Sequence, residues 1–205
     1  MCLQIREVTQ GIRTYSCPFT RMGVMPIGGR STAVRLSDNK SVLVVASTPM
    51  TAATRTSVDE LGTVKYLIAP DAEHYLFLKD WAAVYPNARV CGVERHIQSA
   101  GVPITGVWGR DPNPLGDDPV VNADFASEFV SGHINKEVAL LHKPSGTLIQ
   151  ADLLFNLPAN EQYSAPGAGK PTGGLIRFVF NPASMNPYNS KFQNMVHGQV
   201  ARDKK

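Results

Sequence analysis

The chain has 205 residues, of which 43% are hydrophobic and 18% are charged, a balance that excludes an intrinsically disordered protein. Its 20 Lys and Arg residues against 17 Asp and Glu residues give a net charge of +3, too small to indicate a nucleic-acid-binding protein. This length predicts a single domain over residues 1–205.

The cysteines and the N-terminal residues indicate the cellular compartment. Cys2, Cys17 and Cys91 are odd in number and widely spaced, so we expect neither a disulfide framework nor a cysteine zinc site. Residues 1–7 are charged and lack an apolar stretch, which predicts that there is no signal peptide. No apolar run approaches the roughly 20 residues of a membrane span. We therefore expect a cytoplasmic protein with no membrane partner and no nucleic-acid partner.

The first part of the chain is predicted to form antiparallel hairpins. The alternating segments pair as residues 5–8 with 12–15, and as residues 31–36 with 41–46. The turn-forming residues 37–40 join the second pair, which follows a turn at Gly28-Gly29.

The middle of the chain predicts helices between buried strands. A helix is expected over residues 51–61, with Thr54 or Ser57 as its N-cap and Gly62 as its end. The next three elements are predicted to be a strand at 64–69, a helix at 73–84 and a strand at 89–93. This order defines a βαβ unit with a parallel pair of strands.

The rest of the chain returns to antiparallel strands after a long loop at residues 100–122. These strands are predicted at residues 125–130, 137–142 and 147–151. Residues 157–190 look irregular except for a short strand at 175–180, and residues 188–203 predict a closing amphipathic helix. The whole order favours a mixed α/β fold in which helices cover sheets.

Potential ligands follow three of these strands. Asp71, Glu73 and His74 come after the strand at 64–69, His133 follows the strand at 125–130, and Asp152 ends the strand at 147–151. Carboxylates and imidazoles bind zinc, iron and manganese, and loops that leave buried strands commonly carry sites. The alternative is structural: Glu73 and His74 would cap a helix start, and His133 would be a turn residue.

The motifs around these residues resemble those of the metallo-β-lactamase fold superfamily. There, a strand leads into His-x-His-x-Asp-His, a later Gly-His precedes a hairpin, and the next strand ends in Gly-Asp. The matching stretches are Ala69-Pro70-Asp71-Ala72-Glu73-His74, Gly132-His133 and Ala151-Asp152. Together with Gly28-Gly29-Arg30-Ser31-Thr32 and residues 132–137 and 151–159, they are similar to an uncharacterised fungal and plant branch of that superfamily. The resemblance implies an αββα sandwich of two mixed sheets, incomplete at its C-terminal edge.

The resemblance also implies a degenerate metal site. The first motif histidine falls on Ala69, the second on Asp71, and the motif aspartate on Glu73. The superfamily takes its final histidine from a strand near the C-terminus. Here His197, the only late histidine, lies in a predicted helix, and we assign it no metal role.

A reduced ligand set is what remains. The implied metal ligands are Asp71, His74, His133 and Asp152, which would hold one divalent ion (Zn, Mn, Fe or Mg) or none. Because imidazoles are lost and carboxylates are kept, we expect weak or no zinc retention, and neither β-lactam nor thioester hydrolysis.

Three functions follow from the resemblance. The first is a metal-assisted hydrolase or lyase for a small organic molecule, with Asp71 and Glu73 as catalytic residues that orient water or move a proton. The second is a metal-free accessory protein that binds a small molecule on the same scaffold. The third is metal-free acid–base catalysis by Asp71, Glu73 and His74. An exposed edge at a vacant last strand position would favour a homodimer or a covering helix.

Other residues are candidates for a role in or around the same site. Arg30 could be the charged fork of an anion-binding turn at Gly28-Gly29, although a plain hairpin turn is the simpler interpretation. Several residues after Asp152 are predicted to overhang the cavity: Asn156, Glu161, Gln162 and Tyr163. The residues expected to be solvated or at the surface are Lys136, Glu137, His96 and His142, and those expected in the core are Trp81 and Tyr85.

Overall fold

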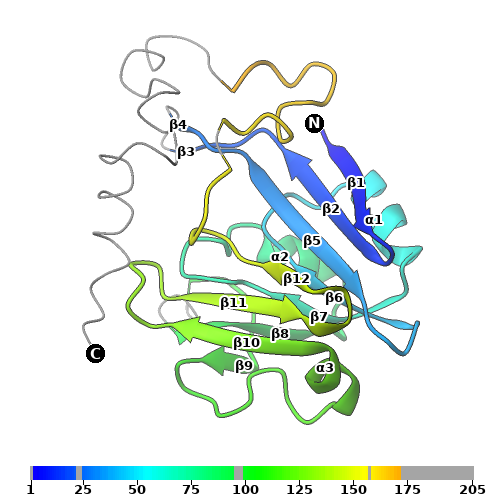
Figure 1. Cartoon of the computed structure of the whole chain (residues 1–205), viewed down its shortest axis with the longest axis vertical. Helices are drawn as coiled ribbons and strands as arrows, with labels where there is room; N and C mark the ends of the chain where they lie inside the picture. The colour runs from blue at the N-terminus through cyan, green and yellow to red at the C-terminus, as the bar shows by residue number, and fades with distance from the viewer. Residues whose placement is uncertain (1, 22–24, 95–98, 157, 172–205) are drawn as a thin grey trace.

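The structure is a computed structural model that describes residues 2–21, 25–94, 99–156 and 158–171 (Figure 1). The strand predicted at 175–180, the helix predicted at 188–203, His96 and His197 lie outside the described residues. Two sheets face each other, and a short hairpin of β3 (Thr20–Arg21) and β4 (Met25–Pro26), which was not predicted, extends from the larger one.

The large sheet has seven strands and mixes antiparallel and parallel pairing. Its strands are, in order across the sheet, β1 (Gln4–Thr9), β2 (Ile12–Cys17), β5 (Gly29–Arg35), β6 (Ser41–Val45), β7 (Thr63–Ile68), β8 (Arg89–Val93) and β9 (Gly106–Trp108). The first four pair as antiparallel neighbours, and β6 to β9 run parallel. Both predicted hairpins and the predicted βαβ unit are confirmed.

The helices α1 (Ala52–Asp59) and α2 (Leu78–Val84) begin at other residues than predicted. Thr51 is the N-cap of α1, since its hydroxyl accepts a hydrogen bond from the backbone N–H of Thr54. Thr54 and Ser57, the predicted caps, are buried on the inner face of this helix instead. The start predicted for α2 at residue 73 is also wrong, because residues 71–77 form turns before the helix begins.

The small sheet is antiparallel throughout, although a second mixed sheet was expected. It consists of β10 (Phe125–Val130), β11 (Glu137–His142) and β12 (Thr147–Ile149), and the 3-10 turn η2 (Lys143–Ser145) joins the last two. The prediction of a long loop over residues 100–122 was wrong in part. That region contains β9 and the start of the helix α3 (Pro119–Asp124), and the three residues of β9 are all buried.

Alternating side chains of the large sheet build two cores. In β6, Leu43 and Val45 pack between the two sheets with Val138 and Leu140 of β11. Their neighbours Val42 and Val44 pack on the opposite face, in the core that contains Leu78 and Trp81 of α2. The described residues thus form helix, sheet and sheet layers, as a mixed α/β sandwich requires.

Two backbone hydrogen bonds join the sheets at one end. The N–H of Val138 donates to the carbonyl of Pro70 at 2.8 Å, and the N–H of Ala72 donates to the carbonyl of Asn135 at 2.9 Å. The loop after β7 is therefore tied to the segment that starts β11, and the potential ligands lie on these two segments and on the loop after β12. None of the helices among the described residues has the length and apolar character that a bilayer-spanning helix needs.

Candidate metal centre

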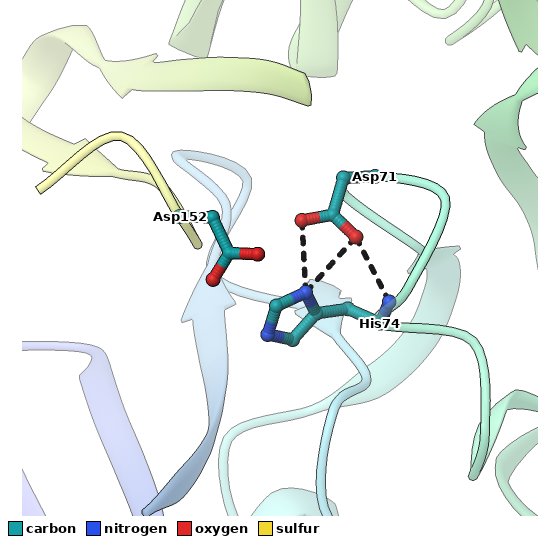
Figure 2. A group of neighbouring side chains, drawn as sticks. All are labelled: Asp71, His74 and Asp152. Carbon is teal, nitrogen blue, oxygen red and sulfur yellow. Dashed lines mark hydrogen bonds and ion pairs between the residues drawn. The ribbon is translucent and has the colours of Figure 1, made fainter. Parts of the chain in front are cut away.

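Asp71, His74 and Asp152 converge where the two sheets are joined (Figure 2). Each offers one potential ligand atom, and these atoms lie within 4.8 Å of one another. Asp71 and His74 come from the turns after β7, and Asp152 comes from the loop after β12. Both aspartates are buried, and the His74 side chain is 30% exposed, so the imidazole forms the accessible part of the cluster.

The carboxylate of Asp71 fixes both the turn and the imidazole of His74. Its Oδ1 accepts hydrogen bonds from the backbone N–H groups of Glu73 at 2.7 Å and His74 at 2.9 Å. The ring Nδ1 of His74 lies 2.9 Å from Oδ1 and 2.8 Å from Oδ2. Figure 2 shows the other ring nitrogen on the side away from Asp71, with Asp152 facing the ring. A carboxylate paired to one nitrogen of a ligating histidine is the usual way to orient such a ligand.

Asp152 is held by two residues that the motif comparison did not identify as part of the site. The side-chain amide of Asn135 donates to Oδ2 of Asp152 at 2.6 Å. The carboxylate of Glu137 accepts the backbone N–H groups of Ala151 at 2.6 Å and Asp152 at 2.8 Å. Glu137 is fully buried, so the expectation that it is solvated was wrong, whereas Lys136 is exposed as predicted.

His133 lies beside this support rather than in the three-residue cluster. It is buried, and its Nδ1 accepts the backbone N–H of Asn135 at 3.3 Å. The same nitrogen lies 3.9 Å from Oε2 of Glu137. The structure thus places His133 next to the residues that hold Asp152, and its role as a metal ligand stays a prediction.

Glu73 points to the solvent-exposed rim of the cluster. Its side chain is 42% exposed, and its Oε2 forms an ion pair with Arg21 at 3.3 Å. It lines the same cavity as His74 and Asp152. A catalytic role for Glu73, like that for Asp71, stays a prediction.

Buried negative charge dominates the electrostatics of the site. Asp71, Glu137 and Asp152 are three buried carboxyl groups, and the imidazole of His74 pairs with the first of them. Burial raises the pKa of Glu137 to about 7 against the two N–H groups that favour its charged form, and Asp71 and Asp152 raise it further. Burial also raises the pKa of Asp152.

His74 responds in the opposite way. Burial by itself lowers the pKa of its imidazole, but the hydrogen bond and the charge of Asp71 raise it to about 8, with help from Asp152 and Glu137. The same contact lowers the pKa of Asp71, although burial works against this. The site thus stabilises positive charge, which can be a proton on His74 or a bound cation.

The donor set fits one divalent cation. Two carboxylates and one imidazole are the mixed oxygen and nitrogen ligands that manganese, iron, magnesium or zinc accept. The excess of buried carboxylates provides the charge that such an ion would neutralise. Asp71, His74 and Asp152 would hold it, and Asn135 and Glu137 would orient the loop that carries Asp152.

Two adjoining cavities open on the cluster. They share four lining residues: Ile27, Gly28, His74 and Asp152. One cavity, of about 280 Å³, has an apolar wall formed by Phe19, Ile27, Leu76 and Phe77. The other, of about 390 Å³, has a polar wall that includes Arg30, Gln150, Asn156, Asn160, Glu161 and Gln162. We call these the apolar branch and the polar branch of the cleft.

The residues predicted to overhang the cavity or to lie at the surface have the following positions. Asn156, Glu161 and Gln162 line the polar branch, as expected, and the Tyr163 hydroxyl donates to the carbonyl of Phe19. His142 was predicted at the surface, but it is buried, with its ring 5.2 Å from that of Phe125.

The two aromatic residues that were predicted in the core are Trp81 and Tyr85. Trp81 is fully buried, as predicted, and Tyr85 packs against the same core.

Comparison with known proteins identifies the fold. No protein-family profile matches the sequence, and no curated protein is detectably similar to it. A metallo-β-lactamase from Pontibacter korlensis has a TM-score of 0.58 at 11% identity, over 77% of this chain and 75% of that one. DIM-1 metallo-β-lactamase exposed to ceftazidime gives 0.56 at 13% identity, over 90% and 84% of the two chains.

A third structure is metallo-β-lactamase FIM-1 from Pseudomonas aeruginosa in a mono-zinc form. It gives a TM-score of 0.55 at 10% identity, over 82% of this chain and 77% of that one. The chain therefore has the metallo-β-lactamase fold, which the motifs had predicted. At such low identities the likeness concerns the fold, and the chemistry has to be argued from the residues of this chain.

Proposed function

We propose that the protein is a metal-assisted hydrolase or lyase for a small organic molecule, with one divalent cation at Asp71, His74 and Asp152. The observation that carries this proposal is the group of buried carboxylates around one imidazole, open to a cleft. The fold supports it, because solved proteins of this fold include a mono-zinc form. We further propose that the chain belongs to the fungal and plant branch that its motifs resemble, with a degenerate site.

Each residue would have a defined part in the reaction. The cation, when bound, supplies Lewis-acid polarisation of the reacting group. In the metal-free site Asp71 orients the imidazole of His74 through Nδ1, and it would exchange this contact for the cation when one is bound. Glu73, at the rim and paired with Arg21, can take up or deliver a proton at its carboxylate. The apolar wall of the cleft limits the access of water to the substrate.

The free cysteines agree with a cytoplasmic setting, which we also propose. Cys2, Cys17 and Cys91 are all unpaired, and thiols remain reduced in the cytoplasm. Cys91 is buried, and burial raises the pKa of its thiol to about 12, so it is not a nucleophile.

Calorimetric titration with MnCl2 tests the site without a substrate. The wild-type protein, freed of metal by dialysis against EDTA, should bind about one ion and release protons, because metal displaces the proton that His74 holds. Asp152→Asn should weaken binding at least about tenfold, since it removes a charged ligand and keeps the shape of the side chain. Asp117→Asn, the same change at an exposed aspartate, should bind like the wild type. Equal affinity of Asp152→Asn and the wild type would refute the site.

A second candidate function is metal-free acid–base catalysis, which one observation favours. Both oxygens of Asp71 contact the Nδ1 of His74, so the pair resembles a carboxylate that orients a histidine base. Turnover that persists in EDTA but disappears in His74→Gln would select this function. Turnover that stops in EDTA and returns with MnCl2 would select the metal-assisted one.

A further inference from the structure

We propose that Arg30, in the polar branch of the cleft, binds a carboxylate group of a small ligand whose apolar part lies in the apolar branch. Arg30 is at the start of β5, directly after the Gly28-Gly29 turn. It lines the same cavity as His74 and Asp152, which are the reacting end of the cleft in the proposed function. The assignment rests on that function only for the location of the chemistry, because binding at Arg30 needs no metal.

The contacts of Arg30 hold its guanidinium in place without saturating it. Its Nε donates to the hydroxyl of Ser16 at 3.1 Å, and its Nη2 pairs with Oε2 of Glu161 at 3.1 Å. Its Nη1 makes no hydrogen bond to any residue that the structure describes, and the side chain is 37% exposed. A fixed guanidinium that lines a cavity and keeps N–H groups unpaired is the arrangement that binds carboxylates.

The charge around Arg30 leaves it available for an anion. Oε2 of Glu161 also forms an ion pair with Arg6, at 3.1 Å, so one carboxylate pairs with two guanidinium groups. These three residues carry an excess of one positive charge. A ligand with a single negative charge would balance it. A phosphate, with nearly two charges, would be repelled more strongly than a carboxylate by Asp152, which lines the same cavity.

The two branches differ enough in chemistry to fix the orientation of the ligand. Phe19, Leu76 and Phe77 line the apolar branch, in which the charged residues Arg21 and Glu73 pair with each other. Amide side chains, together with Leu154 and Phe155, accompany Arg30 in the polar branch. Because both branches meet at His74 and Asp152, a ligand that fills both places its central bonds beside the candidate centre. Gly28 keeps the junction narrow, since a Cβ at this position would lie 2.4 Å from Cγ of Gln162. The inferred ligand class is a small carboxylate with an aryl or alkyl body.

Calorimetric titration with 4-phenylbutyrate tests this inference on the full chain, both in EDTA and with MnCl2. The wild type should bind it in EDTA, and Arg30→Gln should weaken that binding at least about tenfold, the effect of losing one charged hydrogen bond. Arg30→Lys keeps the charge but loses the planar guanidinium, so its affinity should lie between those of the wild type and Arg30→Gln. Arg55→Gln is the matched control, because Arg55 is an exposed arginine that pairs with Asp59 and does not line the cleft, and it should bind within about threefold of the wild type.

Two further ligands complete the experiment. 4-Phenylbutanol, which lacks the charge, should bind equally weakly to the wild type and to Arg30→Gln, and inorganic phosphate should bind more weakly than 4-phenylbutyrate. No binding of 4-phenylbutyrate in EDTA, equal losses in Arg55→Gln and Arg30→Gln, or tighter binding of phosphate would each overturn the inference. Because the deciding measurements are those made in EDTA, without metal, their failure would leave the metal-assisted function standing. Failure of manganese to bind would leave the carboxylate site standing.

Discussion

Replacement of Glu137 by glutamine tests how a buried carboxyl group holds the loop that carries Asp152. Its two oxygens accept the N–H groups of Ala151 and Asp152, at 2.6 and 2.8 Å. Glutamine can accept only one of them, and its NH2 group would face the other donor. The variant should lose about 1–3 kcal/mol of stability, the cost of leaving a buried donor without an acceptor.

This destabilisation should depend on pH, because burial raises the pKa of Glu137 from 4.5 to about 7. Below about pH 4.5 the group is protonated in both the folded and the unfolded state. As the pH rises, the unfolded chain ionises first, so the wild type loses stability until the pH passes the folded pKa. The shift of about 2.5 pKa units corresponds to about 3 kcal/mol in total. Glutamine does not titrate, so its disadvantage should shrink by about 2 kcal/mol between about pH 5 and pH 8.5.

Urea denaturation in EDTA, followed by the fluorescence of the buried Trp81 and Trp108, measures this difference. Glu128→Gln, at an exposed position on the neighbouring strand β10, should show the same small effect at both pH values. A stability difference between Glu137→Gln and the wild type that stays constant from about pH 5 to pH 8.5 would refute the reasoning.

Three other predictions concern the turn, the imidazole and the activity. Gly28→Ala should lower the melting temperature of the protein more than Gly146→Ala does. Both glycines have positive φ, but only Gly28 lies against another residue, Gln162. Equal losses of melting temperature would contradict this close approach. The raised pKa of His74 adds stability below about pH 6.5 that is lost as the pH passes about 8, so in EDTA His74→Gln should melt with a flatter pH profile than the wild type. Nitrocefin should not be cleaved at a measurable rate, and any other turnover should be abolished in His74→Ala; zinc-dependent nitrocefin cleavage would count against the reduced ligand set.

Local signals predicted the larger elements of the fold. Turn-forming residues 37–40 between two apolar segments were enough to predict the β5–β6 hairpin, and buried segments around a helix were enough for the β7–α2–β8 unit. The N-cap of α1 was mispredicted because Thr51, Thr54 and Ser57 can all cap a helix, and tertiary burial decides among them. Strand β9 was missed because three residues are too few to show a period.

The site was predictable where it depends on strand ends and unpredictable where it depends on side-chain partners. Asp71, His74 and Asp152 follow strands that end at one edge of the sandwich, which is why their order in the sequence indicated a shared location. The burial of Glu137 depends on N–H groups 14 and 15 residues further along the chain, and no local pattern records that pairing. The orientation of His133 likewise depends on the fold of its own turn, in which Lys136 has a positive φ.

The two backbone hydrogen bonds that join the sheets, from Val138 to Pro70 and from Ala72 to Asn135, have a kinetic consequence. His74 and Asp152 are on opposite sides of this junction, so neither sheet alone contains the cluster. Separation of the sheets must therefore release a bound cation before the chain can unfold further. A bound ion would therefore slow unfolding, by a larger factor the more tightly the folded protein binds it, and would leave the rate of folding almost unchanged. Addition of metal should slow amide hydrogen exchange at Ala72 and Val138 more than it slows exchange in the rest of either sheet.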